Sequence, residues 1–212
     1  MMTTLILASG SPRRRTFLEL LGLEHEVVPA KIDEPEPGIV ESPEAFARAL
    51  ARAKASVVAS RNPGRPVLAA DTVVSLDNRL LGKPADAAEA IAMLQLLRGR
   101  THDVTTGVAV VDTEGRLRVG AATTRVTMRP YGDDEIEMTV RAGTPFDKAG
   151  GYAIQDQDFL PVAHFDGCYC NVVGLPLALA IDLLRQAGIE PPVTEPYRLL
   201  PYCLACPLFQ RD

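Results

Sequence analysis

The first candidate for chemistry is a basic turn near the N-terminus, Ser9-Gly10-Ser11-Pro12-Arg13-Arg14. The short apolar run before it is typical of a buried strand, and Ser11-Pro12 is typical of a helix start. Free backbone N–H groups at a helix start favour an anion, and arginine binds phosphate oxygens in a bidentate fork. The turn therefore predicts a phosphate site, although the same residues also suit a plain N-capped helix with surface arginines.

Lys54 is the second candidate, because it lies on the apolar side of a predicted helix. At helical spacing it shares one face with Phe46, Leu50 and Val57. A lysine in that position either extends to the surface along its aliphatic stem or points its ammonium group into a cleft. Lys83 is a further cation, and the proline that follows it holds the backbone extended.

Two acidic residues could complement these cations. Asp71 follows the apolar run Val67–Ala70, so its carboxylate is expected where a buried strand ends. A carboxylate there can bind a metal ion or accept a proton from water, and it can equally cap a turn. Glu34 lies in an acidic loop, Lys31–Val40, where alone it would be a solvated charge. Gathered with the cations, the two acids would suit a triphosphate, which carries about four negative charges and usually a divalent metal.

A glycine-containing loop, Lys148–Gln155, is the last candidate for the site. Its paired glycines, Gly150-Gly151, let the backbone approach a ligand closely. The amide of Gln155 can both donate to and accept from the edge of a nucleobase. The other interpretation is a flexible loop without a function.

The elements that must position these residues alternate between strands and helices. Strands are predicted at Leu5–Ala8, His25–Pro29, Val67–Ala70 with its continuation Val73–Leu76, His102–Asp112, Arg116–Thr127 and near Cys168–Val173. Helices are predicted to begin at Ser11, Ser42, Asp86, Asp133 and Pro176. The long central hairpin among alternating elements predicts an α/β fold with a mixed sheet. Residues 1–188 are expected to form one domain, and residues 189–212 a tail that contains proline and cysteine and has no core of its own.

The overall charge limits the classes of partner. The chain has 212 residues with 22 basic and 27 acidic side chains, a formal net charge of −5. Nothing in this balance attracts nucleic acid or an anionic membrane. No apolar run has the length of a membrane span, and the basic residues follow the first apolar run, which is the wrong order for a signal peptide. We therefore expect a cytoplasmic protein without nucleic-acid or membrane partners.

Four cysteines lie in the last quarter of the chain, at Cys168, Cys170, Cys203 and Cys206. The first two would share one side of a strand, and the last two have a chelating spacing, so four thiolates could form a zinc site. The alternative is four free thiols with the last pair in a loose tail. The sequence favours this alternative, because the usual spacing of two zinc knuckles is missing.

Five motifs follow one another in a recognisable order. They are Leu7-Ala8-Ser9-Gly10-Ser11-Pro12-Arg13-Arg14, Ala70-Asp71-Thr72, Gly82-Lys83-Pro84, Asp147-Lys148-Ala149-Gly150 with Tyr152 and Gln155, and Asn171-Val172-Val173-Gly174-Leu175-Pro176. In this order they resemble the Maf-like nucleotide pyrophosphatases, over a stretch from about residue 4 to residue 188. Five motifs in one order are far more specific than any one of them alone.

The resemblance implies a mixed, twisted sheet with flanking helices, forming two lobes around a deep cleft, as in the related inosine triphosphate pyrophosphatases. It implies hydrolysis of a nucleoside triphosphate to the monophosphate and pyrophosphate with a divalent metal, Mg²⁺ or Mn²⁺. By motif position Asp71 is the catalytic carboxylate, acting as the base or mainly as a metal ligand, and Glu34 is the other acidic metal position. The phosphate-contacting positions are Ser9, Arg13, Arg14, Lys54 and Lys83.

The resemblance also bears on the base. A family branch that acts on thymidine and uridine triphosphates has Arg, Thr and Gln at three selectivity positions, which here are Arg13, Thr72 and Gln155. A branch that acts on 7-methyl-GTP has a tryptophan before the arginine, Gln after the Asp and Glu in the late loop. We therefore predict dTTP and UTP as substrates, in a house-cleaning role against non-canonical or modified nucleotides.

Three further expectations follow from the resemblance. Members of the family also resemble regulators of septum formation, so a nucleotide-dependent binding protein is the alternative from another class, beside a pyrophosphatase with a preference for 7-methyl-GTP. The family pattern suggests a homodimer. The segment Asp156–Pro161 replaces a glycine-rich continuation found in many members, so we expect it to reshape one wall of the base pocket.

Overall fold

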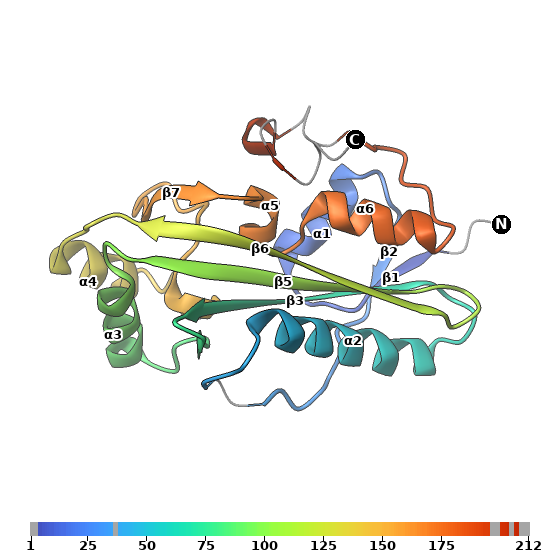
Figure 1. The fold of residues 1–212 in the computed structure, drawn as a ribbon, viewed down its shortest axis with the longest axis horizontal. Helices are drawn as coiled ribbons and strands as arrows, with labels where there is room; N and C mark the ends of the chain where they lie inside the picture. Colours follow the sequence, from blue (N-terminus) through green and yellow to red (C-terminus); the bar gives the residue numbers. More distant parts are fainter. Residues whose placement is uncertain (1–3, 36–37, 196–199, 204–205, 208–212) are drawn as a thin grey trace.

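The computed structural model describes residues 4–35, 38–195, 200–203 and 206–207, and shows one sheet with helices on both faces (Figure 1). The strands lie in the order β2 (His25–Val27), β1 (Leu5–Leu7), β3 (Val67–Leu76), β5 (Thr101–Val111), β6 (Leu117–Met128) and β7 (Val162–Asp166), and β4 (Arg79–Leu81) also pairs with β3. β1 runs parallel to β2 and β3, and the remaining pairs are antiparallel. The predicted α/β fold with a mixed sheet is confirmed.

Helices cover both faces of this sheet. The helix α2 (Pro43–Arg61) lies along one face, and α1 (Pro12–Leu20) and α6 (Leu177–Gln186) lie over the other (Figure 1). Two more, α3 (Ala87–Leu97) and α4 (Asp133–Arg141), lie together at one end of the long strands. All five begin within one residue of their predicted starts, because each start is marked by a local capping residue or proline.

The helix α2 lies close to the sheet because small residues face it. Ala47, Ala51 and Ala55 are fully buried. A side chain at Gly107 on β5 would place its Cβ 2.3 Å from the carbonyl oxygen of Ala47. Val57, which we expected on the inner face, is only partly buried. Alanines make up most of the buried stripe, beside Leu50 and Val58, and a search for large apolar residues overlooks them.

One predicted strand is wrong. The segment near Cys168–Val173 forms a short helix, α5 (Tyr169–Val173), and the strand beside it is β7, which the sequence analysis missed. Glycines at positive φ mark both ends of this region, Gly167 at 132° and Gly174 at 124°. The aromatic and β-branched residues of α5 favour a strand by propensity, but tertiary contacts override that preference. β7 is an edge strand with mostly exposed side chains, so its apolar alternation is weak.

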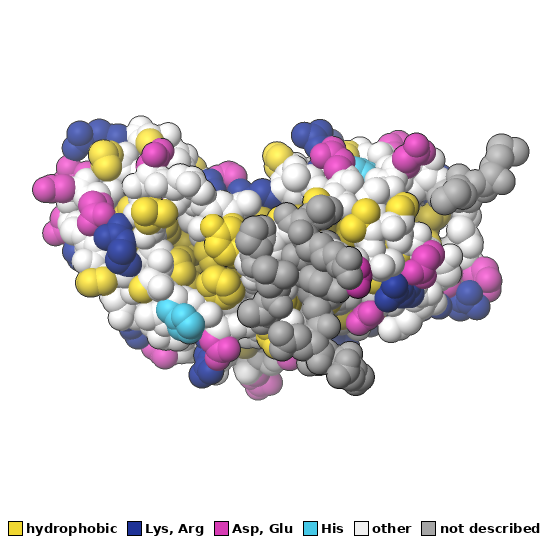
Figure 2. Space-filling model, turned by 90° about the horizontal axis from the view of Figure 1, so that it is seen from above, with side chains coloured by type: hydrophobic (Ala, Val, Ile, Leu, Met, Phe, Trp, Pro, Cys, Tyr) yellow, Lys and Arg dark blue, Asp and Glu magenta, His cyan; other side chains and the backbone are white. Residues whose placement is uncertain are grey.

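Two apolar clusters build the two lobes. One joins α1, α5 and α6 to Ala70 on β3 and Val108 on β5. The other joins α3 and α4 to Val74 on β3 and Val104 on β5. Along β3 the stretch Asp71–Val73 therefore lies between the lobes. Viewed from above, the molecule is indented between its two halves, and basic side chains lie in the indentation (Figure 2).

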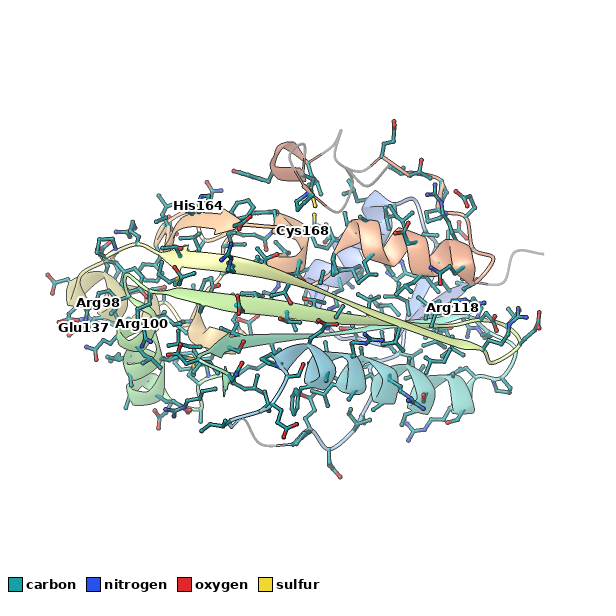
Figure 3. The ribbon with its side chains drawn as sticks, viewed as in Figure 1. Arg98, Arg100, Arg118, Glu137, His164 and Cys168 are labelled. Carbon is teal, nitrogen blue, oxygen red and sulfur yellow. The ribbon has the colours of Figure 1, made fainter. Side chains whose placement is uncertain are left out.

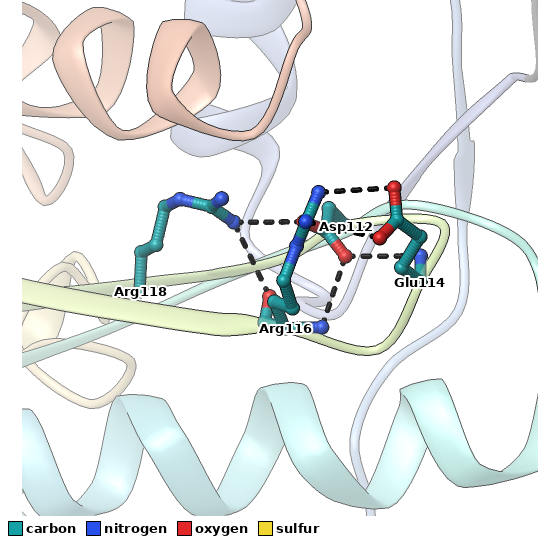
Figure 4. A network of polar contacts seen from close by, with 4 residues as sticks. All are labelled: Asp112, Glu114, Arg116 and Arg118. Atoms are coloured by element: carbon teal, nitrogen blue, oxygen red, sulfur yellow. Dashed lines mark hydrogen bonds and ion pairs between the residues drawn. The ribbon is translucent and has the colours of Figure 1, made fainter.

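Charged side chains gather at both ends of the long strands, with Arg98 and Glu137 at one end and Arg118 at the other (Figure 3). At the second end Asp112 accepts hydrogen bonds from the Arg116 backbone at 2.9 Å and from the Arg116 and Arg118 guanidinium groups at 2.8 and 3.0 Å (Figure 4). Burial opposes ionisation of Asp112, but these hydrogen bonds outweigh it and hold its pKa far below the ordinary value. The network closes the predicted hairpin of β5 and β6.

The C-terminal segment returns to the main core. The backbone N–H of Val193 donates to the carbonyl oxygen of Leu21 at 3.1 Å. Cys203 and Cys206 are buried in the same cluster as α1 and α6. The expectation of a last cysteine pair in a loose tail is therefore wrong, while the domain boundary at residue 188 stays a prediction. No helix in the described ranges has the length and apolarity to cross a membrane.

Candidate active site

A cavity of about 690 Å³ opens between the lobes, beside the middle of β3. β1 pairs with β3 as far as Leu68, and β4 pairs with β3 from Val74 onward. The stretch between these two neighbours faces the cavity, and successive strand side chains point to opposite faces. The cavity can therefore reach both faces of β3. It is lined by every residue predicted for the site: Ser9, Arg13, Arg14, Glu34, Lys54, Asp71, Thr72, Lys83 and Gln155.

Asp71 and Thr72 mark the two faces of β3. In the antiparallel pairing Asp71 stands opposite Gly107, and Thr72 stands opposite Thr106. Gly107 is the residue that lies against α2, so Asp71 points to the α2 face. Thr72 points to the other face, where its hydroxyl lies 2.9 Å from that of Thr106.

On the α2 face one lysine joins two carboxylates. The ammonium group of Lys54, from α2, lies 2.5 Å from Oδ1 of Asp71 and 2.7 Å from Oε1 of Glu34. The Lys54 and Asp71 side chains are 13% and 9% exposed, whereas Glu34 is 53% exposed. Lys54 therefore points into the cavity instead of extending to the surface, and Asp71 does not serve as a turn cap.

On the opposite face Arg14 is held by neutral oxygens. Its Nε donates to the carbonyl oxygen of Gly174 at 2.8 Å, and its two Nη groups donate to the hydroxyls of Ser9 at 3.0 Å and Thr72 at 3.1 Å. The hydroxyl of Ser9 also accepts the backbone N–H of Ser11 at 3.3 Å, which ties the turn to the start of α1. These contacts fix the direction of the Arg14 guanidinium. The sequence predicts only that Arg14 lies in the first turn of a helix.

Among the residues that the structure describes, no acidic side chain contacts the guanidinium of Arg14. Burial lowers the pKa of Arg14, and the charges of Asp71 and Glu34 act in the opposite direction from a distance. Arg14 is half-buried, and a charge that is partly withdrawn from water carries a cost unless an opposite charge contacts it. Because the three hydrogen-bond partners of Arg14 are neutral, an anion that enters the cavity would relieve this cost.

Arg13 forms a further charged group with Asp147 and Lys148. Nη1 of Arg13 lies 3.4 Å from Oδ2 of Asp147, and the ammonium of Lys148 contacts the same carboxylate. Burial opposes ionisation of Asp147, yet hydrogen bonding and charge from Lys148, with charge from Arg13, lower its pKa. Asp147 and Lys148 both line the cavity; Lys148 begins the candidate loop Lys148–Gln155, whereas Asp147 was given no role in the site. Their signal in the sequence is the motif Asp147-Lys148-Ala149-Gly150.

The two loops at the mouth of the cavity are tied together. The backbone N–H of Gly150 donates to the carbonyl oxygen of Gly82 at 3.0 Å, beside the exposed Lys83. Gly150 has φ of 76°, and a Cβ there would lie 3.1 Å from a methyl group of Val74. The glycine is therefore required both for the turn and for the close approach. This contact sets where Lys83 enters the cavity.

Gln155 is exposed and lines the cavity, as predicted. The following segment behaves differently from our expectation. Oδ1 of Asp156 accepts the backbone N–H groups of Asp158 and Phe159, and Phe159 is buried against Tyr131. The segment thus folds onto the α3 and α4 lobe, and none of residues 156–161 lines the cavity. It does not reshape the pocket wall.

A buried polar network missed by sequence reasoning supports Thr72. The hydroxyl of Thr106 donates to the carbonyl oxygen of Asn171 at 3.0 Å, and its backbone N–H donates to Oδ1 of Asn171 at 3.1 Å. Nδ2 of Asn171 donates in turn to the carbonyl oxygen of Val104 and to the hydroxyl of Thr124, at 2.8 and 2.9 Å. Asn171 is fully buried. It belongs to the last sequence motif, which was its only signal.

Tyr152 forms part of the cavity wall and is supported from behind by a histidine. Its hydroxyl lies 2.7 Å from Nε2 of His102. Burial lowers the pKa of His102 to about 4, so the imidazole is neutral near pH 7. The pair holds the loop Lys148–Gln155 against the sheet. Tyr152 belongs to that predicted loop, whereas His102 was not predicted as part of the site.

Glu34 and Asp71 fit the donor set of a divalent cation bound together with a triphosphate. Magnesium in such sites takes one or two protein carboxylates and completes its coordination with phosphate oxygens and water. Both carboxylates contact the same Lys54 ammonium, so both reach one point in the cavity. Around this point the described residues offer no third acidic or histidine ligand, and a substrate would have to complete the coordination.

Comparison with known proteins gives one consistent result. Residues 4–187 match the family model described as Maf-like protein. A dTTP/UTP pyrophosphatase from Thermomicrobium roseum is 56% identical over 206 residues, which cover 97% of this chain and 94% of the relative. Enzymes of the same description from Myxococcus xanthus and Nitratidesulfovibrio vulgaris are 50% and 47% identical, over 90% and 87% of this chain and 95% and 89% of the relatives.

Proposed function

We propose, from the premise that this chain belongs to the Maf-like protein family, that it hydrolyses dTTP and UTP to the nucleoside monophosphate and pyrophosphate. The observation that supports the proposal most directly is one cavity that holds several basic side chains beside two neighbouring carboxylates. A nucleoside triphosphate carries about four negative charges near its reacting phosphorus, so its turnover depends mainly on positioning and on charge stabilisation. The cavity offers both.

The basic turn would hold the phosphates on the Arg14 face. The guanidinium of Arg14 is already oriented by three hydrogen bonds, so little conformational entropy is lost when it binds an anion. Arg13 beside it, and Lys83 at the mouth, would offset the remaining charge. Ser9 would add a hydroxyl contact, because its oxygen already lies within the group that surrounds Arg14.

Asp71 would act on the attacking water. The water oxygen forms a bond to the α-phosphorus while the bond from that phosphorus to the bridging oxygen breaks, and the electron pair leaves with pyrophosphate. Asp71 accepts the water proton, and Lys54 fixes the direction of the carboxylate through its 2.5 Å contact. A divalent cation, Mg²⁺ or Mn²⁺, held by Asp71 and Glu34 would supply further charge neutralisation when bound.

The base preference would rest on Gln155, Thr72 and Arg13. An amide such as that of Gln155 can pair with both the donor and the acceptors of a pyrimidine edge, whereas a carboxylate suits the donors of a guanine. Because Asp156–Pro161 folds away from the cavity, the nucleobase would be selected by the residues that match the thymidine and uridine pattern. This supports dTTP and UTP over 7-methyl-GTP.

A regulatory protein of septum formation would bind the nucleotide without turning it over. The cavity favours turnover, because a carboxylate at the edge of β3 lies beside phosphate-binding cations. We further propose that the enzyme is cytoplasmic and forms a homodimer. Light scattering after size-exclusion chromatography, with a mass near 46 kDa expected from the chain mass of 22.8 kDa, tests the dimer.

A nucleotide panel tests the function. The purified chain is incubated with Mg²⁺ or Mn²⁺ and each of dTTP, UTP, CTP, ATP, GTP and 7-methyl-GTP, and pyrophosphate release is measured. We expect the highest kcat/KM for dTTP and UTP, and no release after the metal is chelated. Tight binding of every nucleotide without release would contradict the enzyme, and a preference for 7-methyl-GTP would contradict the base assignment.

A further inference from the structure

All four cysteines of the chain meet at one place, away from the candidate active site. We call Cys168, Cys170, Cys203 and Cys206 the thiol cluster. Each is at most 1% exposed. The first two lie at the start of α5, and the last two lie in the C-terminal segment, whose short helical turn is Pro201–Cys203. Figure 3 shows Cys168 directly beneath that segment.

The sulfur atoms form a connected group and not two isolated pairs. Sγ of Cys170 lies 2.9 Å from Sγ of Cys203. The thiol of Cys168 lies close enough to those of Cys170 and Cys206 to interact with both. The contacts therefore run from one cysteine of the C-terminal segment, through both cysteines of α5, to the other cysteine of that segment. Two ligands from each of two chain segments is the usual composition of a structural four-thiolate site.

We propose that the thiol cluster binds one thiophilic divalent cation with the chemistry of zinc, and that this ion fastens the C-terminal segment to α5. Cys203 and Cys206 have the spacing that lets two thiolates hold one ion, and the two cysteines of α5 complete a set of four. A soft thiolate set of this kind selects zinc over the magnesium or manganese expected at the carboxylates of the cavity. The two sites are therefore chemically independent.

The thiols stand closer together than ligands do around an ion. As they stand, the described residues contain no group of three or more histidine, cysteine, aspartate or glutamate side chains that could hold a metal ion, so the thiol cluster would have to open to bind one. Two thiolates on a tetrahedral zinc lie about 3.8 Å apart, since each Zn–S bond is about 2.3 Å. The 2.9 Å contact of Cys170 and Cys203 is that of thiols sharing protons. Binding would release these protons and separate the two sulfur atoms by roughly 1 Å.

The position of the cluster suggests what the ion would do. Two residues after Cys170, the stretch Val172–Gly174 begins to line the active-site cavity, and the carbonyl oxygen of Gly174 accepts a hydrogen bond from Arg14. An ion bound behind α5 would hold this wall in place. It would stabilise the fold strongly and affect turnover only through the rigidity of the wall, because no thiol of the cluster lines the cavity.

Metal analysis of the full-length chain tests the proposal. The chain is produced with zinc present, dialysed against a weak chelator, and its zinc content is measured by mass spectrometry beside a thiol titration in denaturant. We expect one zinc per chain and four titratable thiols. The double variant Cys203→Ser with Cys206→Ser should lose the zinc, whereas Asp71→Asn, which alters the cavity, should keep it.

Cobalt substitution gives a readout that does not depend on activity. With Co²⁺ the wild-type chain should show thiolate-to-cobalt charge-transfer absorption, and Cys170→Ser should weaken it even if that variant is less stable. Four titratable thiols with no bound zinc and no such absorption would overturn the proposal. Fewer than four titratable thiols before reduction would also overturn it, because the cluster would then hold disulfides.

Discussion

The two faces of β3 at the cavity balance their charges in opposite ways. On the α2 face, the carboxylates of Asp71 and Glu34 share the single ammonium of Lys54, at 2.5 and 2.7 Å. On the other face the guanidinium of Arg14 contacts three oxygens, all of them neutral. One face is therefore short of positive charge, and the other is short of negative charge.

This difference divides the work of the site between neighbouring residues. A cation and a triphosphate entering together would correct both imbalances, because the cation completes the α2 face and the phosphates complete the Arg14 face. Side chains alternate between the two faces along β3, so the adjacent residues Asp71 and Thr72 point to opposite faces. This alternation alone separates the position of the cation from that of the phosphates. Substitutions on the two faces should then fail in different ways.

The largest effect is expected for Asp71→Asn. Asparagine keeps an oxygen near Lys54 but cannot accept the water proton, so kcat should fall by about 10²–10⁴-fold. Thermal unfolding should change little, because the amide is close in shape to the carboxylate. Glu34→Gln serves as the comparison on the same face and should lose less, since Glu34 is half exposed and only assists the cation. Near wild-type turnover of Asp71→Asn would remove the proposed base.

Replacing Arg14 or Lys54 by methionine should have different effects on the stability of the protein. Arg14→Met removes an uncompensated charge, so kcat/KM should fall by about 10²-fold while the melting temperature stays level or rises. Lys54→Met leaves Asp71 and Glu34 without their counterion, so the free energy of unfolding should fall by about 2 kcal/mol or more. Differential scanning calorimetry beside steady-state kinetics measures both. Equal destabilisation by the two variants would show that Arg14 is as well paired as Lys54.

Much of this arrangement could be predicted from local patterns. The basic turn predicts both the start of α1 and a phosphate site, because capping residues and proline act over a few positions. The helical register of Lys54 limits where its side chain can point. The expectation that Asp71 follows the end of a strand is wrong, because β3 continues unbroken through it to Leu76, and the alternation of that strand directs its side chain. The order of the five motifs then joins segments that no single pattern could join.

The remaining features depend on contacts between distant parts of the chain. The partner of Arg14 is the carbonyl oxygen of Gly174, 160 residues away. The helix α5 reads as a strand by propensity, and only its packing against β5 and β6 makes it helical. The thiol cluster likewise depends on where the C-terminal segment lies, which no capping residue or periodicity specifies.

A smaller effect is expected at the base pocket. Gln155→Glu removes an amide donor and adds a carboxylate at the cavity wall, so kcat/KM for dTTP and UTP should fall by about tenfold relative to the guanine nucleotides. Gln157→Glu is the matched control, because it makes the same change in the exposed segment that folds away from the cavity. Unchanged ratios across the nucleotide panel for Gln155→Glu would exclude this amide from base selection.

The smallest effect on turnover is expected for Thr106→Val. This variant tests whether the position of Arg14 depends on the hydrogen bonds behind Thr72. Thr106 and Thr105 are adjacent on β5 and both buried, but only the hydroxyl of Thr106 contacts Thr72, whereas that of Thr105 pairs with Thr123 at 2.9 Å. Valine at either position removes one hydroxyl and should lower the free energy of unfolding by about 1–3 kcal/mol. Thr106→Val should also lower kcat/KM by roughly threefold, because Thr72 and through it the Arg14 guanidinium lose support. Thr105→Val should leave kcat/KM unchanged. If the two variants lose stability equally and neither changes kcat/KM, then Arg14 is positioned by Ser9 and the Gly174 carbonyl alone, and the network behind Thr72 serves only to hold the fold together.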